Sequence, residues 1–513
     1  MKLKDLLSGV AVLEYGVSED TEITQISSDS RSILCGGLFI CVEGKSRNGH
    51  DYIGDALSKG AAAVVAGDRD KIPEDTPYAL VENTRLAEAY IWSNWYGNPS
   101  RGMKTVAVTG TNGKTSTVFM IREILKAAGE KVGIITTVRA MAGEEILGTF
   151  GGSSVTDAAS AMTTPDPEFL YGTIRMMKEK AVTALVFEAS SHALSQYKTD
   201  PMAIDTAVFT NLSEEHLDYH GTMENYFKSK LRLAESADTL VINSDDSYMR
   251  RIKDMYSARK TVIACSADAK SPEHLTADVS ALRQKEISLD GCEYIYFSRD
   301  AVFCLTCPVP GEFTVQNTLL AATAAMTISA RAENVKDALA NLKRIDGRLE
   351  EVDLSEFGVK FKVFIDYAHT PAALESLLMS VRKLRRRGQR ICVLFGCGGN
   401  RDRSKRRKMG AIASRLADFV IVTSDNSRKE DTGEIIAEIV SGLDLEKSHA
   451  VIKDRREAIT YAVVEARDDD ILILAGKGHE KYEIDSEGKK PFDEAAIVRD
   501  AVIKYKVNKN REQ

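Results

Sequence analysis

The chain has 513 residues, more than a single hydrophobic core usually serves, so we expect several domains. Hydrophobic residues make up 43% and charged residues 28%, which is the balance of an ordinary globular protein and excludes a fibrous or disordered chain. The formal net charge of −7 gives no general basic field, so we expect no nucleic-acid partner, and any anionic ligand must be met by local cations or backbone amides.

The start of the chain does not indicate export or membrane insertion. Its first residues, "MKLKDLLSGV", lack the apolar core and cleavage site of a signal peptide. No apolar run in the sequence reaches the length of a membrane span. We therefore expect a cytoplasmic protein with no membrane insertion.

Short apolar runs alternate with amphipathic helical stretches in three series along the chain. The first series closes at "WYGNPSR", whose Gly, Pro and Ser are typical of a linker, and another boundary falls near "KRIDGRLEEV". Strands that alternate with helices predict mainly parallel sheets covered on both faces. We predict an α/β fold with three domains, at residues 1–98, 99–345 and 346–513.

The segment "VAVTGTNGKTST", Val106 to Thr117, predicts a strand, a glycine-containing loop and a helix in that order. Backbone amides and a helix N-terminus then face one point where a phosphate can bind. Lys114 adds a positive charge for the phosphates, and the hydroxyl of Thr115 suits Mg²⁺. The spacing departs from the general P-loop, because Val108 stands where that motif has its first glycine.

Acidic and histidine side chains follow two further predicted strands. Glu188 ends the run "LVFEAS", and His216 follows the run "AVFTNL". Ligands of open α/β sheets bind beyond the carboxyl ends of the strands, so both segments are expected near the phosphate loop. A carboxylate is a natural Mg²⁺ ligand, whereas a histidine at this place is equally explained as a hydrogen-bonded structural residue.

Nine ordered motifs resemble the Mur ligases, and among them the MurE branch. They read "GTNGKTS", "EASSHAL", "TNLSEEHLDYHGTMENYFKSK", "NTLLAA", "GRLEEV", "DYAHTP", "FGCGGNRDRSKR", "SDNSR" and "GKGHEKYEI". With "SSDSR" near the start, the resemblance covers nearly the whole chain. The resemblance implies a small N-terminal UDP-binding domain, a central P-loop-type ATPase domain and a Rossmann-like C-terminal domain. It also implies a monomeric, ATP-dependent ligase of peptidoglycan synthesis that acts on UDP-MurNAc-L-Ala-D-Glu.

The implied reaction activates the D-Glu γ-carboxylate as an acyl phosphate and then joins it to the amino group of a diamino acid. Cations are needed because a carboxylate must approach a triphosphate, and Mg²⁺ with Lys114 offsets that repulsion. Lys230 matches a lysine that the family carries as a carbamate; its pattern alone indicates a solvated helix lysine. As a carbamate it would offer oxygen to Mg²⁺ together with Thr115, Glu188 and His216.

The resemblance assigns three sets of binding residues. The implied ATP set comprises Gly110, Thr111, Asn112, Gly113, Lys114, Thr115, Ser116, Asn317, Arg348 and Asp366. The implied precursor set comprises Ser28, Ser30, Lys45, Ser46, Arg47, Thr163, Thr164, Ser190, Gln196 and Lys198, the last in place of the family's usual arginine. The implied acceptor set comprises Arg401, Asp425, Asn426, Ser427, Arg428, Gly476 and Glu480.

The acceptor turn "SDNSR" matches the family motif D-N-P-R of branches that add meso-2,6-diaminopimelate, except that Ser427 replaces proline. A guanidinium grips a carboxylate with two hydrogen bonds, so Arg428 suits the far carboxylate of that acceptor, which L-lysine lacks. Glu480 would face its distal ammonium. Without any ligand, Asp or Asn in this turn is also explained as a cap for the helix that follows.

Three alternatives stay open at this stage. The same ligase could take L-lysine, and a folylpolyglutamate-synthase-like ligase shares the loop and the carbamylated lysine but lacks the UDP-binding domain. A P-loop switch would bind nucleotide without forming a bond.

Overall fold

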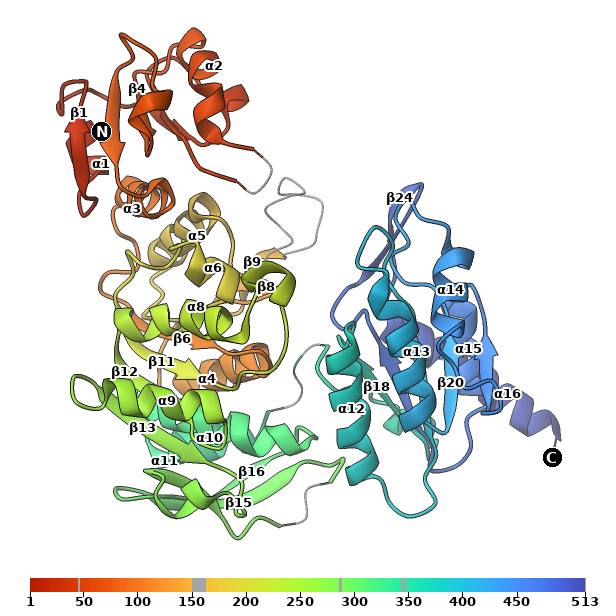
Figure 1. Ribbon diagram of the computed structural model, residues 1–513. Coiled ribbons are helices and arrows are strands. Elements are labelled where there is room, and N and C mark those ends of the chain that lie inside the picture. Colours follow the sequence, from red (N-terminus) through yellow and green to blue (C-terminus); the bar gives the residue numbers. More distant parts are fainter. Residues whose placement is uncertain (45–46, 150–162, 286–287, 343–344, 346, 513) are drawn as a thin grey trace. The chain divides into compact units, whose positions relative to one another are not determined.

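The N-terminal segment builds a five-stranded sheet from short apolar strands (Figure 1). The computed structural model describes residues 1–44, 47–149, 163–285, 288–342, 345 and 347–512. The strand order is β1-β5-β4-β3-β2, and all neighbours are parallel except β1 and β5. The elements are β1 (Val12–Tyr15), β2 (Gln25–Ser27), β3 (Gly37–Ile40), β4 (Ala63–Ala66), β5 (Tyr78–Val81), α1 (Leu3–Leu6), α2 (Ile53–Ser58) and α3 (Thr84–Trp95).

An eleven-stranded sheet follows, in the order β16-β15-β14-β13-β12-β11-β6-β10-β7-β8-β9. Its strands are β6 (Lys104–Thr109), β7 (Val132–Ile135), β8 (Arg139–Ala142), β9 (Glu145–Thr149), β10 (Ala184–Glu188), β11 (Ile204–Phe209), β12 (Ala237–Asn243), β13 (Thr261–Ser266), β14 (Val279–Leu282), β15 (Cys292–Ser298) and β16 (Val302–Cys307). The run from β7 to β14 is parallel. Every residue of β10 is buried, so both faces of the sheet are covered there.

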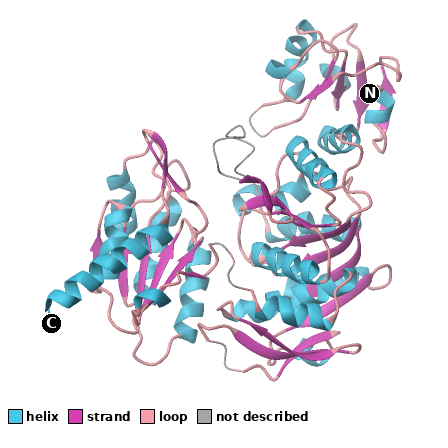
Figure 2. Cartoon of the chain, turned by 180° about the vertical axis from the view of Figure 1, so that it is seen from behind, coloured by secondary structure: helices cyan, strands magenta, loops and turns pink. Residues whose placement is uncertain are grey.

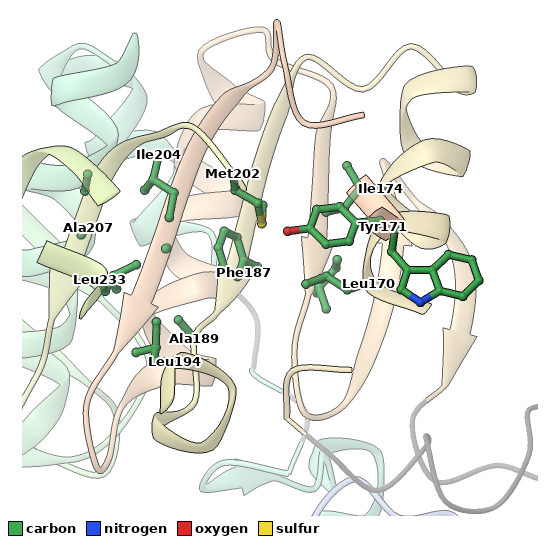
Figure 3. Close-up of a cluster of buried hydrophobic side chains, with 14 of the residues drawn as sticks. Leu170, Tyr171, Ile174, Phe187, Ala189, Leu194, Met202, Ile204, Ala207 and Leu233 are labelled. Atoms are coloured by element: carbon green, nitrogen blue, oxygen red, sulfur yellow. The ribbon is translucent and has the colours of Figure 1, made fainter. Parts of the chain in front are cut away.

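The covering helices are α4 (Lys114–Ala127), α5 (Pro167–Glu179), α6 (Ser191–Ser195), α7 (Leu217–His220), α8 (Met223–Ser236), α9 (Ser247–Tyr256), α10 (Glu312–Ile328) and α11 (Ala332–Ala340). Figure 3 shows part of the core between them and the sheet, where Tyr171 of α5 and Leu233 of α8 lie in one buried cluster with Phe187 of β10. This cluster continues to Leu38 and Val65 of the first sheet.

The C-terminal part is a six-stranded sheet with helices on both faces (Figure 2). Its order is β17-β18-β22-β19-β20-β21, parallel except for β17. Alternate residues serve opposite faces: Val393 packs with α12 to α14, and Leu394 packs with α15 and α16. The elements are β17 (Glu350–Glu351), β18 (Lys362–Asp366), β19 (Ile391–Phe395), β20 (Phe419–Val422), β21 (His449–Val451), β22 (Ile471–Ala475), β23 (Tyr482–Asp485), β24 (Gly488–Pro491), α12 (Pro371–Leu384), α13 (Ser404–Leu416), α14 (Thr432–Val440), α15 (Arg455–Val464) and α16 (Glu494–Glu512).

The α/β prediction with mainly parallel sheets is therefore confirmed. The chain divides into two compact units, Met1–Leu282 with Tyr296–Phe303 and Gln316–Ala338, and Arg283–Ile295 with Cys304–Val315 and Leu339–Gln513. The three domains with boundaries at 98/99 and 345/346 remain a prediction. Among the helices of the described residues, none has both the length and the apolarity needed to cross a bilayer.

A carboxyl group lies where α3 meets the central helices of the first unit. Burial, and the negative charge of Asp166, raise the pKa of Glu88 on α3 to about 7, while Ser28 donates a hydrogen bond that opposes the rise. The positive charge of Lys198 opposes it as well. Folding therefore favours the protonated form of this carboxyl group.

We expect Glu88→Gln to gain stability over the wild type as the pH rises. Folding raises the pKa of Glu88, so the protonated side chain contributes to the free energy of unfolding. This contribution is fully present below the ordinary value of 4.5 and is lost as the pH passes about 7. Thermal unfolding between these limits should show a difference that grows to about 1–2 kcal/mol above pH 7. Glu74→Gln, at an exposed carboxylate, is the control; a gap independent of pH would contradict the prediction.

Candidate functional site

Two glycines shape the loop between β6 and α4. Gly113 caps the helix with a φ of +85°, and a Cβ there would lie 2.6 Å from Oδ1 of the buried Asn317. Gly110 has a φ of +147°, and its Cβ would lie 1.9 Å from the hydroxyl oxygen of Thr210. Side chains are therefore excluded at both positions, and the loop backbone packs directly against β11 and α10.

The end of β11 holds this loop by a set of hydrogen bonds. The amide of Thr111 donates to the carbonyl oxygen of Asn211 (2.8 Å), and the amide of Asn112 donates to Oδ1 of Asn211 (2.9 Å). The hydroxyl of Thr210 donates to the carbonyl oxygen of Asn112 (2.6 Å). The loop thus has a fixed conformation at the N-terminus of α4, the arrangement that suits phosphate binding.

The carboxylate of Glu188 lies beside the first turn of α4. It is 1% exposed, and its Oε1 accepts hydrogen bonds from the hydroxyl of Thr115 (2.8 Å) and the amide of Thr137 (3.0 Å). Oε2 accepts from the hydroxyl of Thr137 (3.1 Å). Thr115 and Glu188 lie together as predicted from the sequence, whereas Thr137, directly after β7, was not predicted because no motif surrounds it.

Two lysines converge on the same loop carbonyl. Lys114 donates to the carbonyl oxygens of Gly110 (3.0 Å) and Thr111 (2.8 Å), and Lys230 on α8 donates to that of Gly110 (2.9 Å). Lys230 is 1% exposed, and its ammonium lies 4.6 Å from the ring centroid of Tyr226. Burial, and then the charge of Lys114, place the pKa of Lys230 well below its usual value. Lys230 is therefore a buried amine and not a solvated surface lysine.

His216 lies at the start of α7 with a left-handed φ of +56°. Its ring is 4.8 Å from that of His192, and its Nε2 is 3.9 Å from a carboxylate oxygen of Glu215. Its side chain is 46% exposed, and burial lowers its pKa. Within the described residues, no group of three or more His, Cys, Asp or Glu side chains is arranged to hold a metal ion. A metal here would need ligands of other kinds, such as hydroxyls, phosphates or water.

The proposed precursor residues of the central segment adjoin Glu188. The hydroxyl of Thr164 donates to the carbonyl oxygen of Glu188 (2.8 Å) and accepts from the amide of Ser190 (3.1 Å). The hydroxyl oxygens of Thr163 and Thr137 share a hydrogen bond (3.2 Å). The hydroxyl groups of Thr163 and Thr164 therefore lie next to the segment that carries Glu188.

The remaining precursor residues are more dispersed. Lys198 is 3% exposed and forms an ion pair with Asp166 (2.7 Å), and Gln196 donates to the hydroxyl of Tyr219 (3.2 Å). In the first sheet, Ser30 is buried, whereas Ser28 and Arg47 are exposed. Lys45 and Ser46 lie outside the described residues.

The second unit collects the proposed acceptor residues beyond the carboxyl ends of β19, β20 and β22. Asn426 lies at the centre: its Nδ2 donates to Glu480 (2.8 Å), and its Oδ1 accepts from Lys477 (3.1 Å) and from the amide of Ile484 (2.9 Å). Asp425 and Ser427 beside it are buried, and Arg401 is exposed. The side chain of Asn426 thus joins the turn after β20 to the loop after β22.

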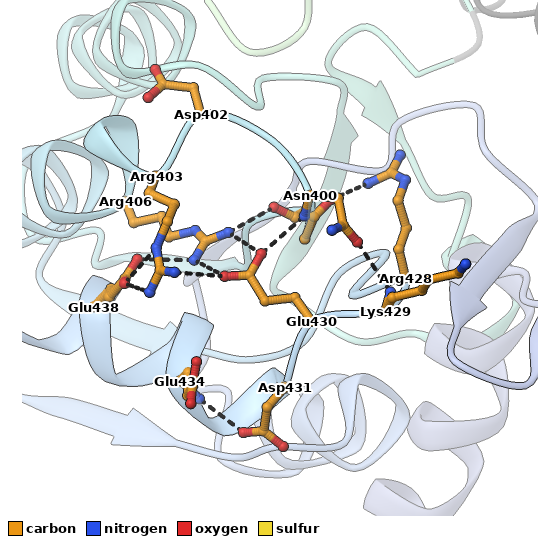
Figure 4. Close-up of polar contacts among 12 residues, drawn as sticks. Asn400, Asp402, Arg403, Arg406, Arg428, Lys429, Glu430, Asp431, Glu434 and Glu438 are labelled. Carbon is orange, nitrogen blue, oxygen red and sulfur yellow. Dashed lines mark hydrogen bonds and ion pairs between the residues drawn. The ribbon is translucent and has the colours of Figure 1, made fainter.

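Arg428 has a left-handed φ of +54°, and its Nη1 donates to the carbonyl oxygens of Gly399 (3.0 Å) and Asn426 (3.2 Å) (Figure 4). These contacts hold the guanidinium between the loops after β19 and β20. Behind it, the fully buried Arg406 forms ion pairs with Glu430 (2.7 Å) and Glu438 (2.9 Å). Figure 4 shows how this network supports the turn.

Charges of both signs lie close together under the turn. Lys477 is fully buried, with its Nζ 3.6 Å from Oδ1 of Asp425. Burial would raise the pKa of Asp425, but the charges of Lys477 and Arg455 outweigh it and lower that pKa. Burial and the charge of Asp425 raise the pKa of Glu480. Lys477 lies in the motif "GKGHE", but only Gly476 and Glu480 of this motif were predicted to be acceptor-binding residues.

Arg348 and Asp366 also lie in this unit. The carboxylate of Asp366 accepts from the amides of Leu349 and Ala368 (both 2.8 Å), and burial raises its pKa. The guanidinium carbon of Arg348 is 5.4 Å from the ring centroid of Tyr367. Asp366 thus orders the segment that carries Arg348.

The turn "SDNSR" does not cap the following helix, which corrects one reading of the sequence. The cap of α14 is Asp431, whose Oδ1 accepts from the amide of Glu434 (3.0 Å). Asn426 and Arg428 instead contact the neighbouring loops. The side chains of Asn426 and Arg428 are therefore used for tertiary contacts and not for helix capping.

Comparisons with known protein families find three successive matches. Residues 22–91 match the Mur ligase family, catalytic domain; residues 108–325 match the Mur ligase middle domain; and residues 347–478 match the Mur ligase, glutamate ligase domain. The matches include the phosphate loop, Glu188 and Lys230 in the middle domain, and the turn that carries Arg428 in the last.

Known proteins match over the full length. The UDP-N-acetylmuramoyl-L-alanyl-D-glutamate–2,6-diaminopimelate ligase of Caldanaerobacter subterraneus subsp. tengcongensis is 38% identical, and the match covers 98% of each chain. A solved structure with the same enzyme name has a TM-score of 0.68 and 28% identity and covers 98% of this chain and 99% of its own. The MurF ligase of Thermotoga maritima in complex with ADP has a TM-score of 0.56 and 17% identity, covering 95% and 97%. The chain belongs to the Mur ligase family.

Proposed function

We propose that the protein is an ATP-dependent ligase that joins 2,6-diaminopimelate, in its meso form, to the D-Glu γ-carboxylate of UDP-N-acetylmuramoyl-L-alanyl-D-glutamate. The observation that carries the proposal is 38% identity across 98% of the chain to an enzyme of that name. The fixed phosphate loop, the buried pair of Thr115 and Glu188, and the turn with Arg428 support it independently. The reaction would serve peptidoglycan synthesis.

The residues beside the loop fit Mg²⁺ by their chemistry. Thr115 and Glu188 offer a hydroxyl and a carboxylate oxygen 2.8 Å apart, the hard donors that Mg²⁺ takes alongside phosphate oxygens and water. When bound, Mg²⁺ would offset negative charge on the phosphates. Thr137 holds the carboxylate in place through both of its oxygens, and His216 remains a proposed further ligand.

The proposed reaction has two steps, a phosphoryl transfer and the formation of an amide bond. A γ-carboxylate oxygen of the precursor attacks the γ-phosphorus of ATP, ADP leaves, and an acyl phosphate forms. The amino nitrogen of the acceptor then attacks the acyl carbon, loses a proton, and phosphate leaves with the former carboxylate oxygen. The loop amides from Gly110 to Ser116 and the ammonium of Lys114 would bind the phosphates, with Asn317, Arg348 and Asp366 as further nucleotide contacts.

Lys230 fits a carbamate because of its surroundings. Burial lowers its pKa, so the neutral amine that reacts with CO₂ is favoured at Nζ. The nitrogen would bond to the carbon of CO₂ and release a proton. A carbamate oxygen in place of an ammonium would turn a second cation beside Lys114 into a metal ligand.

The precursor would contact Thr163, Thr164, Ser190, Gln196 and Lys198 in the middle domain. Further contacts come from Ser28, Ser30, Lys45, Ser46 and Arg47 in the first. The hydroxyls next to Glu188 suit the sugar peptide, and the cations suit its diphosphate and carboxylates. Lys198 carries one charge but lacks the two-pronged geometry of arginine, and Asp166 holds it at 2.7 Å.

The acceptor would bind in the second unit. Arg428 is held by Nη1, so Nε and Nη2 remain oriented donors for the far carboxylate of diaminopimelate. Glu480 accepts from Asn426 and would face the distal ammonium, with Arg401, Asp425, Ser427 and Gly476 around it. L-Lysine would leave Arg428 without a carboxylate, which disfavours it as the acceptor.

The function is tested by phosphate release in a panel of substrates. We expect release only when ATP, UDP-MurNAc-L-Ala-D-Glu and meso-2,6-diaminopimelate are all present, with L-lysine and L-ornithine much poorer. Release with a folate and glutamate would support the folylpolyglutamate-synthase alternative. Nucleotide binding without acceptor-dependent release would support the switch and overturn the proposal.

We expect Lys230→Ala to lose at least about a hundredfold in turnover, because the oxygen ligand beside the phosphates is removed. Added CO₂ should not restore the rate, whereas a short carboxylate such as acetate should restore part of it. Wild-type protein in ¹³C-bicarbonate should give a carbamate signal in the NMR spectrum that the variant lacks. Lys228→Ala, at an exposed lysine of the same helix, is the control, and undiminished turnover in Lys230→Ala would sink this role.

We expect Arg428→Ala to lower kcat/KM for meso-2,6-diaminopimelate by about 2–3 kcal/mol, the cost of an unmatched charged group. The slow reaction with L-lysine should change little. Arg428→Lys keeps a charge and should recover only part of the lost kcat/KM, because an ammonium cannot donate the two parallel hydrogen bonds of a guanidinium. Lys429→Ala is the neighbouring control, and an equal loss with both acceptors would contradict a contact to the far carboxylate.

A further inference from the structure

A basic cavity lies in the second unit at the edge of the sheet opposite to the acceptor residues. It measures about 420 Å³ and is lined by Arg382, Arg385, Arg386, Arg387, Gly388, Gln389, Arg390 and Asp418. Arg390 immediately precedes β19 and Asp418 immediately precedes β20, whereas the acceptor residues follow these strands. Within this unit, the arginine cavity is therefore separate from the proposed acceptor residues.

Carboxylates at the starts of the strands fix the walls of the arginine cavity. Asp418 forms an ion pair with Arg385 and accepts a hydrogen bond from the amide of Ile391 (2.8 Å). Asp470 forms an ion pair with Arg390 at 2.6 Å. These two guanidiniums are thus held by the sheet, and less conformational entropy is lost when they bind a ligand.

The loop that forms the rest of the cavity is also braced. The side chain of Gln389 accepts from the amide of Arg386 (2.7 Å) and donates to the carbonyl oxygen of Asp469 (3.2 Å). Arg382 donates to the carbonyl oxygen of Arg415 (3.2 Å). Arg386 and Arg387 are exposed on this loop. Arg382 on α12 is exposed as well, and Nη2 of Arg386 lies 3.9 Å from a carboxylate oxygen of Asp290. The loop is thus a defined turn that presents guanidiniums to solvent.

The residues that line the arginine cavity favour an anionic ligand with several phosphoryl groups. Five arginines and one aspartate line the cavity, and Asp470 and Asp290 form ion pairs with Arg390 and Arg386 from beside it, so positive charge is in excess here on a chain whose net charge is −7. The lining residues are all polar, charged or glycine, which disfavours an apolar ligand or an inserted lipid chain. Guanidiniums bind phosphate oxygens in pairs of hydrogen bonds, and several of them suit one ligand with several phosphoryl groups.

We propose that the arginine cavity binds a small oligophosphate anion, such as the phosphate chain of a nucleoside di- or triphosphate, apart from the acceptor residues of the same unit. A lipid headgroup shares the phosphate chemistry, but a lining without apolar side chains favours the free anion. Arg386 and Arg387 would close around the anion, and Arg382, Arg385 and Arg390 would contact it from the other side.

The test uses hydrogen exchange on the full chain with inorganic tripolyphosphate as the probe and sodium chloride at equal ionic strength as the reference. Peptides that cover 382–391 should be protected by tripolyphosphate and not by the salt. Arg386→Gln with Arg387→Gln should weaken this protection about a hundredfold in tripolyphosphate concentration, since each lost charged hydrogen bond is worth about tenfold and two arginines are replaced. Arg407→Gln with Lys408→Gln, an exposed pair on α13 with the same change of charge, should not.

Ligase turnover and the protection of peptides that cover 110–117 should be the same in both double variants. A failure of tripolyphosphate binding at the arginine cavity can therefore be told apart from a failure of the proposed ligase function. Absence of protection at 382–391, or its survival in the Arg386 and Arg387 variant, would overturn the proposal. So would protection by phosphatidylglycerol vesicles in the absence of any effect of tripolyphosphate, because a membrane surface would then be the partner.

Discussion

The arrangement around the loop between β6 and α4 depends on one buried carboxylate, that of Glu188. It also depends on the rule that parallel strands end at a common edge. β10 pairs with β6 on one side and β7 on the other, so the phosphate loop after β6 and Thr137 after β7 reach the same carboxylate. β11 pairs with β6 and locks the loop from the other direction. The same rule brings the loops after β18, β22, β19 and β20 together in the second unit.

Features set by local pattern could be predicted from the sequence. The segment "VAVTGTNGKTST" became the end of β6, the loop and the start of α4, and the run "LVFEAS" became the end of β10, because apolar β-branched runs next to turn residues leave little choice. The pairing of Thr115 with Glu188 was also predictable, since strand order alone places both at one edge. Ordered motifs identified the family, which three domain matches confirm.

Contacts that depend on tertiary geometry could not be predicted. The cap at Asp431 follows local spacing, since Glu434 lies three residues later, whereas the burial of Asp425 beside Lys477 does not follow from the sequence pattern. Thr137 had no motif around it, and Lys477 needed the position of Asn426 to acquire a role. The burial of Lys230 depends on packing against Gly110 and Tyr226, which its helix pattern does not encode.

The hairpin of β23 and β24 is tied to the acceptor turn through its backbone. Ile484 donates its amide to Asn426 and accepts from the amide of Arg428, and Glu483 accepts from the hydroxyl of Ser424 (3.0 Å). The turn and the hairpin are therefore one structural module, although about fifty residues of chain separate them. An exchange of acceptor preference between enzymes of this fold would have to graft both segments together, since a transplanted turn alone would lose the hydrogen bonds that orient its arginine.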